Sequence, residues 1–271
     1  MNVKTATVLL FGLSLIACQS VQTTRPGAVG VDRKQQVLSF VSEQDLERSS
    51  ALAYKQELQQ AAQKGALNAD AGALRRVKAV ASRLIPQTAA FRPDAPGWNW
   101  EVNVATNKEM NAYAMPGGKI MVYTGLIDQL HLSDAELAAV LGHEIGHALR
   151  EHSRERVSRA YGQQLALSIG AAALGIDQSG SQLAGTIADV TFQLPHSREQ
   201  ESEADRIGLE LMARAGYDPA AAISVWQKMS QSAAGGTPQF LSTHPSNESR
   251  IRDLQTHLAQ VQPLYRASGG R

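Results

Sequence analysis

Hydrophobic positions in the first third of the chain recur at helical spacing. From Asp45 to Leu67, apolar residues return every three or four positions among charged and amide residues, which predicts a helix. A second helix is expected from Asn68, as its N-terminal cap, to about Leu84. Pro86 should end this helix, because proline has no N–H to donate to the preceding turn.

The pattern changes to strict alternation of apolar and polar residues at Trp98–Val104, which predicts a strand with one buried face. Asn111–Met115 and Lys119–Tyr123 are predicted as two further strands, joined by a turn at Pro116-Gly117-Gly118. The expected sheet is therefore small, and it comes directly before the next helix.

That next helix has a strong start signal. Ser133 and Glu136 have the spacing of a capping box, in which each side chain bonds the backbone N–H of the other residue. Apolar residues then follow at helical intervals, namely Leu137, Val140, Leu141, Ile145 and Ala148.

More helices are expected at Arg198–Ala215, from about Pro219, and at Asn247–Val261, which should stop before Pro263. The small apolar stretch Leu165–Ile176 is shorter than the ~20 residues that cross a bilayer, so it predicts a packed helix or a membrane-facing hairpin. The fold class expected is α+β and mostly helical, with a small β-sheet beside the capped helix.

Composition limits what the chain can do. Of its 271 residues 43% are hydrophobic, enough for one sizeable core or at most two small ones. Lys and Arg number 26 against 25 Asp and Glu, so the basic surplus that neutralises phosphates is missing, and no nucleic-acid partner is expected. Cys18 is the one cysteine, so a metal would have to be held by His, Asp or Glu.

The first residues are predicted to be a targeting signal. Lys4 precedes the apolar stretch Thr5–Ala17, which is too short to span a bilayer of ~30 Å but suits a secretory signal. Its end, Leu15-Ile16-Ala17-Cys18, resembles the lipobox of bacterial lipoproteins, in which the cysteine is lipidated and becomes the first mature residue. The alternative is an ordinary signal peptide with a chance cysteine.

The lipobox resemblance implies a location and a domain plan. Gln19 after the cysteine implies the outer membrane, with the protein facing the periplasm and anchored by acyl chains. We expect a signal peptide at 1–17, the lipidated cysteine and a tether at 18–42, one folded domain at 43–265 and a tail at 266–271. The tether is expected because its Thr, Pro and Gly residues show little periodicity.

The capped helix carries the sequence His143-Glu144-Ile145-Gly146-His147. Two imidazoles four residues apart lie on one helix face and can reach a single zinc ion at ~2.0–2.1 Å. Glu144, beside the open coordination position, can accept a proton from metal-bound water and pass it to the leaving amine. Gly146 is expected to permit close approach of a strand or of the substrate.

A catalytic zinc site needs a third protein ligand. His152, five residues after His147, would point roughly a third of a helical turn away, so it is predicted to be a structural or surface histidine. Glu201 is the better candidate, and Asp205 on the same helix face could orient a ligand imidazole. An acidic, solvated helix face is the alternative, and spacing alone does not decide between them.

The motifs occur in a specific order: the His143–His147 motif, Ser197-Arg198, Glu201-x-Glu-Ala-Asp205, and His244-Pro245-Ser246 with Arg250. From about Val102 to Arg250 the chain resembles a gluzincin family of zinc metallopeptidases. That family includes the CaaX prenyl protease, the bacterial heat-shock membrane protease and the β-barrel-assembly-enhancing protease of the periplasm. The resemblance implies a gluzincin-like peptidase domain.

The resemblance also implies residue roles. It makes His143, His147 and Glu201 the ligands of one Zn²⁺ per chain, with Glu144 as general base and Asp205 behind the ligands. Asn111 and Ala112 fall where the family has an edge strand that grips an extended substrate.

Two later residues have less settled roles. The resemblance implies that His244 either supports the transition state or occupies the open coordination position, and that Arg250 helps to stabilise the oxyanion. The alternative makes Thr243–Asn247 a helix-initiating loop with Arg250 on a solvated face.

The function implied is a zinc-dependent endopeptidase of the bacterial cell envelope that degrades misfolded or stalled periplasmic and outer-membrane proteins. Its expected partners are these polypeptides, the membrane through the lipid anchor, and the outer-membrane assembly machinery. Two alternatives are an envelope chaperone or assembly factor that has a zinc site but little proteolysis, and a structural lipoprotein with an accidental motif. The transmembrane helices of the prenyl proteases are missing from the sequence, so cleavage of prenylated substrates is not expected.

Overall fold

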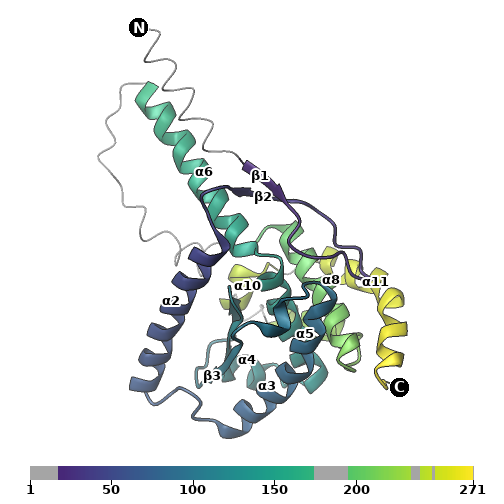
Figure 1. The fold of residues 1–271 in the computed structure, drawn as a ribbon. Helices are drawn as coiled ribbons and strands as arrows, with labels where there is room; N and C mark the ends of the chain where they lie inside the picture. The colour runs from purple at the N-terminus through teal and green to yellow at the C-terminus, as the bar shows by residue number, and fades with distance from the viewer. Residues whose placement is uncertain (1–17, 174–194, 233–238, 246–247, 271) are drawn as a thin grey trace.

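The computed structural model describes residues 18–173, 195–232, 239–245 and 248–270 (Figure 1). The signal peptide expected at 1–17, Asn247 at the start of the expected last helix and residues 174–176 of the expected apolar stretch lie outside these residues. The described elements are, in order, β1 (Cys18–Val21), β2 (Gln35–Leu38), α2 (Glu43–Gln63), α3 (Ala71–Leu84), the 3₁₀ helices η1 (Ile85–Ala90) and η2 (Ala95–Gly97), β3 (Glu101–Ala105), β4 (Ala112–Met115), β5 (Lys119–Tyr123), α4 (Thr124–Gln129), α5 (Asp134–Leu149), α6 (His152–Ala173), α8 (Arg198–Arg214), α9 (Ala221–Ser232), α10 (Gln239–Thr243) and α11 (Glu248–Ala267).

A three-stranded sheet has the order β3-β5-β4, with β3 parallel and β4 antiparallel to β5. The β4–β5 hairpin turns at Gly117 and Gly118, whose φ angles of 76° and 81° suit glycine because it has no Cβ. The order leaves β4 at one side of the sheet, and β4 packs against α5. The mostly helical fold with a small sheet beside α5 confirms the expected α+β class.

Helix α5 lies at the centre of the core. The capping box of Ser133 and Glu136 is confirmed, and Leu137, Leu141 and Ile145 are fully buried. Because nearly all of α5 is buried, its polar residues are held in place by packing from all sides.

Helices α5 and α8 approach each other closely because small residues face one another. A Cβ on Gly208 would lie 2.7 Å from the backbone nitrogen of His143, and one on Gly146 would lie 3.0 Å from the Cα of Ala204. We expected Gly146 to admit a strand or the substrate, but it is helix α8 that it admits. This contact brings together the two helices that carry the predicted ligands His143, His147 and Glu201.

The N-terminal segment differs from the expected tether. β1 pairs antiparallel with β2, and between them Val29 and Val31 are 2% exposed in the main core. The Glu210 carboxylate of α8 accepts hydrogen bonds from the amides of Ala28 and Val29, at 2.7 and 3.1 Å. Residues 18–38 are therefore strapped onto the domain.

Arg33 and Arg150 hold this N-terminal strap in place. Arg33 contacts Glu155 of α6 at 2.7 Å and Glu203 of α8 at 2.5 Å. Arg150, fully buried after α5, donates to the carbonyl of Arg33, and its own carbonyl accepts a hydrogen bond from Gln35. The strap thus ties three helices together at their ends.

Two helix ends also differ from expectation. Helix α3 is capped by Asp70, whose carboxylate accepts from the Ala73 amide, because Asn68 has a left-handed φ of 54° and bonds the β3 strand at Val104 instead. Helix α11 continues through Pro263 to Ala267.

The stretch from Leu165 belongs to α6 as far as Ala173, so this part forms a helix. Helix α6 runs from the motif region past β2, and its far end projects beyond the body of the domain (Figure 1). Of the helices in the described residues, none combines the length and apolar composition needed to cross a membrane.

Candidate metal centre

Helix α5 presents His143, Glu144 and His147 toward β4, and all three side chains are buried. The Nε2 atoms of the two histidines lie 3.0 Å apart, as the four-residue spacing predicts. The two imidazoles are therefore aimed at one common point.

Glu201 reaches the same point from α8. Its Oε2 lies 3.6 Å from Nε2 of His143, and its Oε1 lies 3.4 Å from Nε2 of His147. The carboxylate is 1% exposed, and although burial raises its pKa, the Arg250 and His244 charges lower that pKa well below its usual value. Glu201 therefore stays ionised, as a metal ligand must.

His244, which follows α10, completes the cluster. Its Nδ1 lies 3.2 Å from Nε2 of His143 and 3.0 Å from Oε1 of Glu201. One ligand atom from each of His143, His147, Glu201 and His244 falls within 4.8 Å of all the others. The structure thus places His244 where it could be a fourth protein ligand.

Asp205 contacts His143 at the ring nitrogen Nδ1, on the side opposite the cluster. Its Oδ1 lies 2.9 Å from Nδ1 of His143, and both its oxygens accept hydrogen bonds from Arg250, each at 2.7 Å. Burial raises the pKa of Asp205, but the contacts with Arg250 and His143 lower it by more. The net result is a pKa below the usual value. An ionised Asp205 accepts a hydrogen bond from Nδ1–H and leaves the Nε2 lone pair of His143 for a metal.

His152 contacts His147 at the corresponding ring nitrogen, Nδ1. Its Nδ1 lies 2.8 Å from Nδ1 of His147, and its Nε2 lies 3.0 Å from Oε2 of Glu203. We expected a structural or surface histidine that points roughly a third of a turn away; His152 is a buried, structural histidine, but it faces His147. The helix does not continue as assumed: Glu151 has a left-handed φ of 50°, which ends α5 and turns His152 back toward the site.

Arg250 lies behind the ligands. Its Nη1 is 2.6 Å from Oε2 of Glu201, and its guanidinium stacks 3.7 Å over the ring of Trp226. We expected Arg250 to contact the oxyanion or to lie on a solvated face. It is 3% exposed and binds two carboxylates, which favours a positioning role.

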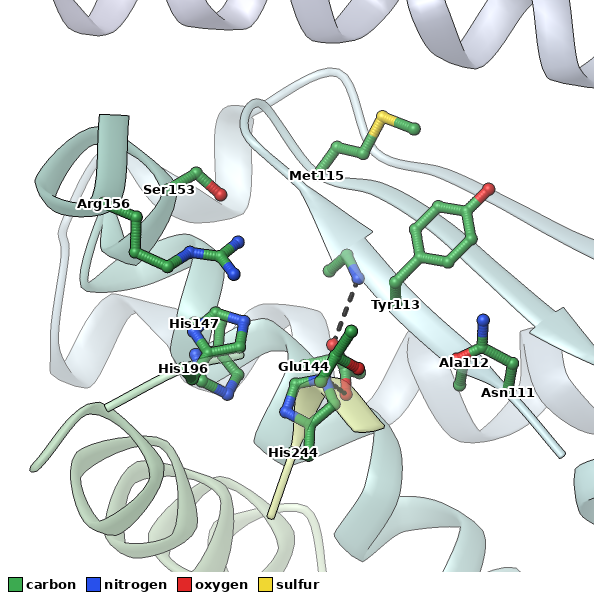
Figure 2. Close-up of a pocket in the computed structure, with 12 residues that line it drawn as sticks. Asn111, Ala112, Tyr113, Met115, Glu144, His147, Ser153, Arg156, His196 and His244 are labelled. Atoms are coloured by element: carbon green, nitrogen blue, oxygen red, sulfur yellow. Dashed lines mark hydrogen bonds and ion pairs between the residues drawn. The ribbon is translucent and has the colours of Figure 1, made fainter. Parts of the chain in front are cut away.

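Glu144 stands beside the cluster, between α5 and β4 (Figure 2). Its Oε2 accepts a hydrogen bond of 3.3 Å from the Ala114 amide, and its Oε1 lies 3.5 Å from Nε2 of His244. Burial raises the pKa of Glu144. A carboxylate with a raised pKa holds an accepted proton more firmly, which suits a general base.

A pocket opens over this cluster, with β4 as one wall (Figure 2). Asn111 and Ala112, the expected substrate strand, line it. Sequence reasoning missed Ser153, Arg156 and His196, which line the opposite side. The full lining comprises Asn111, Ala112, Tyr113, Ala114, Met115, Glu144, His147, Ser153, Arg156, His196, Thr243 and His244.

The donor set fits a metal ion. Burial lowers the pKa of His147 well below its usual value, so its ring is neutral and can offer a lone pair. His143 and His147 each use Nδ1 for a buried partner and direct Nε2 at Glu201. Imidazole nitrogens, an ionised carboxylate and supporting hydrogen bonds are what a protein metal site requires.

The fold and this cluster define a metallopeptidase. The chain belongs to Peptidase family M48, which matches residues 71–258.

Three named relatives illustrate the similarity. The chain is 38% identical over 165 residues to the mitochondrial metalloendopeptidase OMA1 of Schizosaccharomyces pombe, covering 60% of this chain and 48% of that protein. It is 40% identical to OMA1 of Arabidopsis thaliana, covering 58% and 31%, and 31% identical to the metalloprotease LoiP of Escherichia coli, covering 59% and 63%. The match thus spans half or less of each OMA1 and just under two thirds of LoiP.

Proposed function

We propose that this chain is a zinc-dependent endopeptidase of the bacterial cell envelope. One observation carries the proposal: His143 and His147 of α5 meet Glu201 of α8 with their ligand atoms 3.0 to 3.6 Å apart, and Glu144 stands beside them. Two histidines and one glutamate are the ligand set of a catalytic zinc site that keeps an open position.

Different residues would carry out different steps of peptide-bond hydrolysis. A bound zinc ion would polarise a water molecule and the scissile carbonyl. Glu144 accepts the proton of the attacking water and delivers it to the leaving amine. As the alternative to the resting role given below, His244, whose Nε2 lies 3.5 Å from Glu144, would donate to the developing oxyanion.

An extended polypeptide would lie along the outer side of β4. This side faces the pocket and is not used by β5, which pairs with the other side. Backbone hydrogen bonds to Ala112 would hold the substrate largely independently of its sequence, and Asn111, whose carbonyl accepts from the Tyr123 amide of β5, would contact it through its side chain. Such binding suits unfolded segments, because most of the backbone N–H and C=O groups of a folded protein are already paired.

His244 supports a resting state with four protein ligands. Its Nδ1 lies among the other three ligand groups, at the place that a water or substrate would need. We propose that His244 occupies the open position until a substrate displaces it.

The cellular assignment rests on Cys18 and on the bacterial relative. Cys18 is exposed at the start of β1, so its thiol is accessible to lipidation, which would anchor the protein to the outer membrane on its periplasmic side. Substrates would be misfolded or stalled envelope polypeptides, and the outer-membrane assembly machinery is a candidate partner. The identity to the mitochondrial OMA1 proteins is 38–40%, against 31% for LoiP, so the envelope location is tested separately by fractionation.

The central test is cleavage of casein by the purified protein with metal analysis of the same sample. About one zinc per chain, and activity lost to a chelator and restored by zinc, are expected. Membrane fractionation of wild type and Cys18→Ser tests the anchor, since only the wild type should stay with the outer membrane.

The alternative function is a chaperone or assembly factor that keeps zinc but rarely cuts. Complementation of a deletion strain by Glu144→Gln would favour that alternative, because this variant should bind polypeptide without hydrolysing it.

A further inference from the structure

One wall of the pocket carries a cationic side chain, Arg156, that the proposed mechanism does not use. Ser153 and Arg156 of α6 line it across from β4, together with His196, which precedes α8. In Figure 2 the Arg156 side chain reaches from α6 toward the pocket, and its guanidinium lies on the His147 side.

Arg156 is buried but keeps its charge. The residue is 6% exposed, and burial lowers its pKa to about 10, while the Glu201 and Glu144 carboxylates act in the opposite direction. A pKa of about 10 leaves the guanidinium protonated at neutral pH. The pocket therefore presents a desolvated positive charge to whatever enters it.

Two other buried arginines lie outside the pocket. Arg150 lies 3.0 Å from Glu203, and Arg250 lies 2.7 Å from Asp205, and neither lines the pocket. Arg156 is the arginine that lines it, among the described residues. Its position is therefore suited to contact with substrate.

The place of Arg156 argues against contact with the oxyanion. Glu144 and His244, which flank the reacting carbonyl in the proposed mechanism, lie close together beneath Ala114. The Arg156 guanidinium stands to one side of them, toward the Met115 end of β4 (Figure 2). A substrate strand along β4 would bring a neighbouring residue, not the scissile carbonyl, to this charge.

We propose that Arg156 is a specificity-determining residue that binds a carboxylate of the substrate polypeptide close to the cleaved bond. This assignment rests on the proposed peptidase function. The planar guanidinium matches a carboxylate with two parallel hydrogen bonds, and such charge-assisted bonds are strong where water is excluded. The carboxylate belongs either to an aspartate or glutamate side chain of the substrate or to the C-terminus of the substrate. The experiment below distinguishes these two sources.

The experiment uses a set of quenched fluorescent peptides built on one parent sequence. In each peptide a single position near the cleaved bond carries Glu, Gln or Lys. Each peptide is made with a free and with an amidated C-terminus. The wild-type enzyme should show kcat/KM about 10-fold to 100-fold higher for Glu than for Gln at one position, the size of one buried charge-assisted hydrogen bond. If the terminal carboxylate is the ligand, the free peptides should be preferred over the amidated ones by the same factor.

Four variants locate the effect. Arg156→Gln should bring the ratio between acidic and neutral peptides close to one, and Arg156→Glu should favour the Lys peptide. Arg159→Gln is the matched control, because Arg159 is exposed on the same helix and should keep the wild-type ratio. Thermal melting of each variant checks folding, and Arg156→Lys retains the charge if the others do not fold.

The outcomes separate this proposal from the one on which it rests. Cleavage of acidic and neutral peptides at equal rates by the wild type, with either terminus, would overturn the assignment of Arg156 alone. A preference that Arg156→Gln leaves intact would overturn it as well. Failure to cleave any peptide with zinc bound would overturn the proposed function itself.

Discussion

The carboxylate of Asp205 lies 2.9 Å from Nδ1 of His143 and fixes the direction in which the opposite ring nitrogen points. Asp205→Asn keeps the shape of the side chain but removes the charge that faces Nδ1–H. We expect zinc affinity to fall about 10-fold to 100-fold, the usual effect of losing such a partner. Competition titration with a chelating dye measures it, with Asp128→Asn at an exposed position as control. Unchanged affinity would show that Asp205 does not orient the ligand.

Glu144→Gln should separate metal binding from catalysis. The amide cannot accept the proton of the attacking water, so kcat should fall by at least ~10²-fold, the scale of a general base. Zinc content should be unchanged, because Glu144 is not among the four grouped ligand residues. Glu199→Gln, exposed in the first turn of α8, is the control. Casein cleavage at the wild-type rate by Glu144→Gln would refute the assignment.

His244→Ala tests the resting state. Removing an imidazole that occupies the open position should raise the basal cleavage of a short peptide. If the plugged form holds about nine in ten molecules, the rise should be about 10-fold, because only the competent fraction binds substrate. Initial rates at equal zinc occupancy measure the effect. A variant that holds zinc but is merely inactive would instead assign His244 to transition-state support.

The contact between Gly208 and the His143 backbone makes an unusual prediction for helix stability. Alanine normally stabilises a helix by about 1 kcal/mol relative to glycine. At Gly208 the added Cβ would lie 2.7 Å from the His143 nitrogen, so Gly208→Ala should lower the free energy of unfolding by about 1–3 kcal/mol. It should also weaken zinc binding by separating α5 from α8. Gly162→Ala is the control, because its Cβ would meet no atom within 4 Å, and urea unfolding of both variants should show opposite signs.

The contact of Glu155 with Arg33 predicts a pH dependence. Burial raises the pKa of Glu155, but hydrogen bonds from Arg33 and Gln200 lower it by more. The pKa of Glu155 therefore lies below the ordinary value of 4.5. The stabilisation is therefore complete above pH 4.5 and lost as the pH falls through the lower, folded-state pKa. Glu155→Gln should lower stability at pH 7 by about 1–3 kcal/mol and flatten the acid side of the stability curve. Melting temperatures from pH 7 to pH 3 measure this.

The control for that experiment is Glu248→Gln, which removes an exposed surface pair with Arg252. Such a pair contributes little, so this variant should follow the wild-type curve. An acid limb that is equally steep in Glu155→Gln would show that the contact does not set the pH dependence.

Local periodicity accounts for what the sequence predicts well. The spacing of His143 and His147 on α5, and of Glu201 and Asp205 on α8, places each pair on one helix face, and the structure brings all four side chains together. The capping box at Ser133 likewise depends on residues three positions apart. Within a single regular helix, position along the chain determines direction in space.

The predictions failed where regular geometry stops. His152 turned toward the site because Glu151 adopts a left-handed φ, which no helical spacing can anticipate. The strap at residues 18–38 was missed because Val29 and Val31 recur with no period, and their burial depends on partners far along the chain, such as Glu210. Arg156 was missed for the same reason, since only the packing of α6 shows that it lines the pocket.

The N-terminal strap has a mechanical consequence for an anchored protein. Cys18 lies at the first position of a paired strand, and Arg33 fastens the same segment to helices α6 and α8. An acyl chain on Cys18 would therefore have almost no slack, and the catalytic centre would stay at a set height and orientation above the bilayer. The catalytic centre of such an enzyme would not reach substrates far from the membrane. It would cleave only polypeptides that come to the membrane surface.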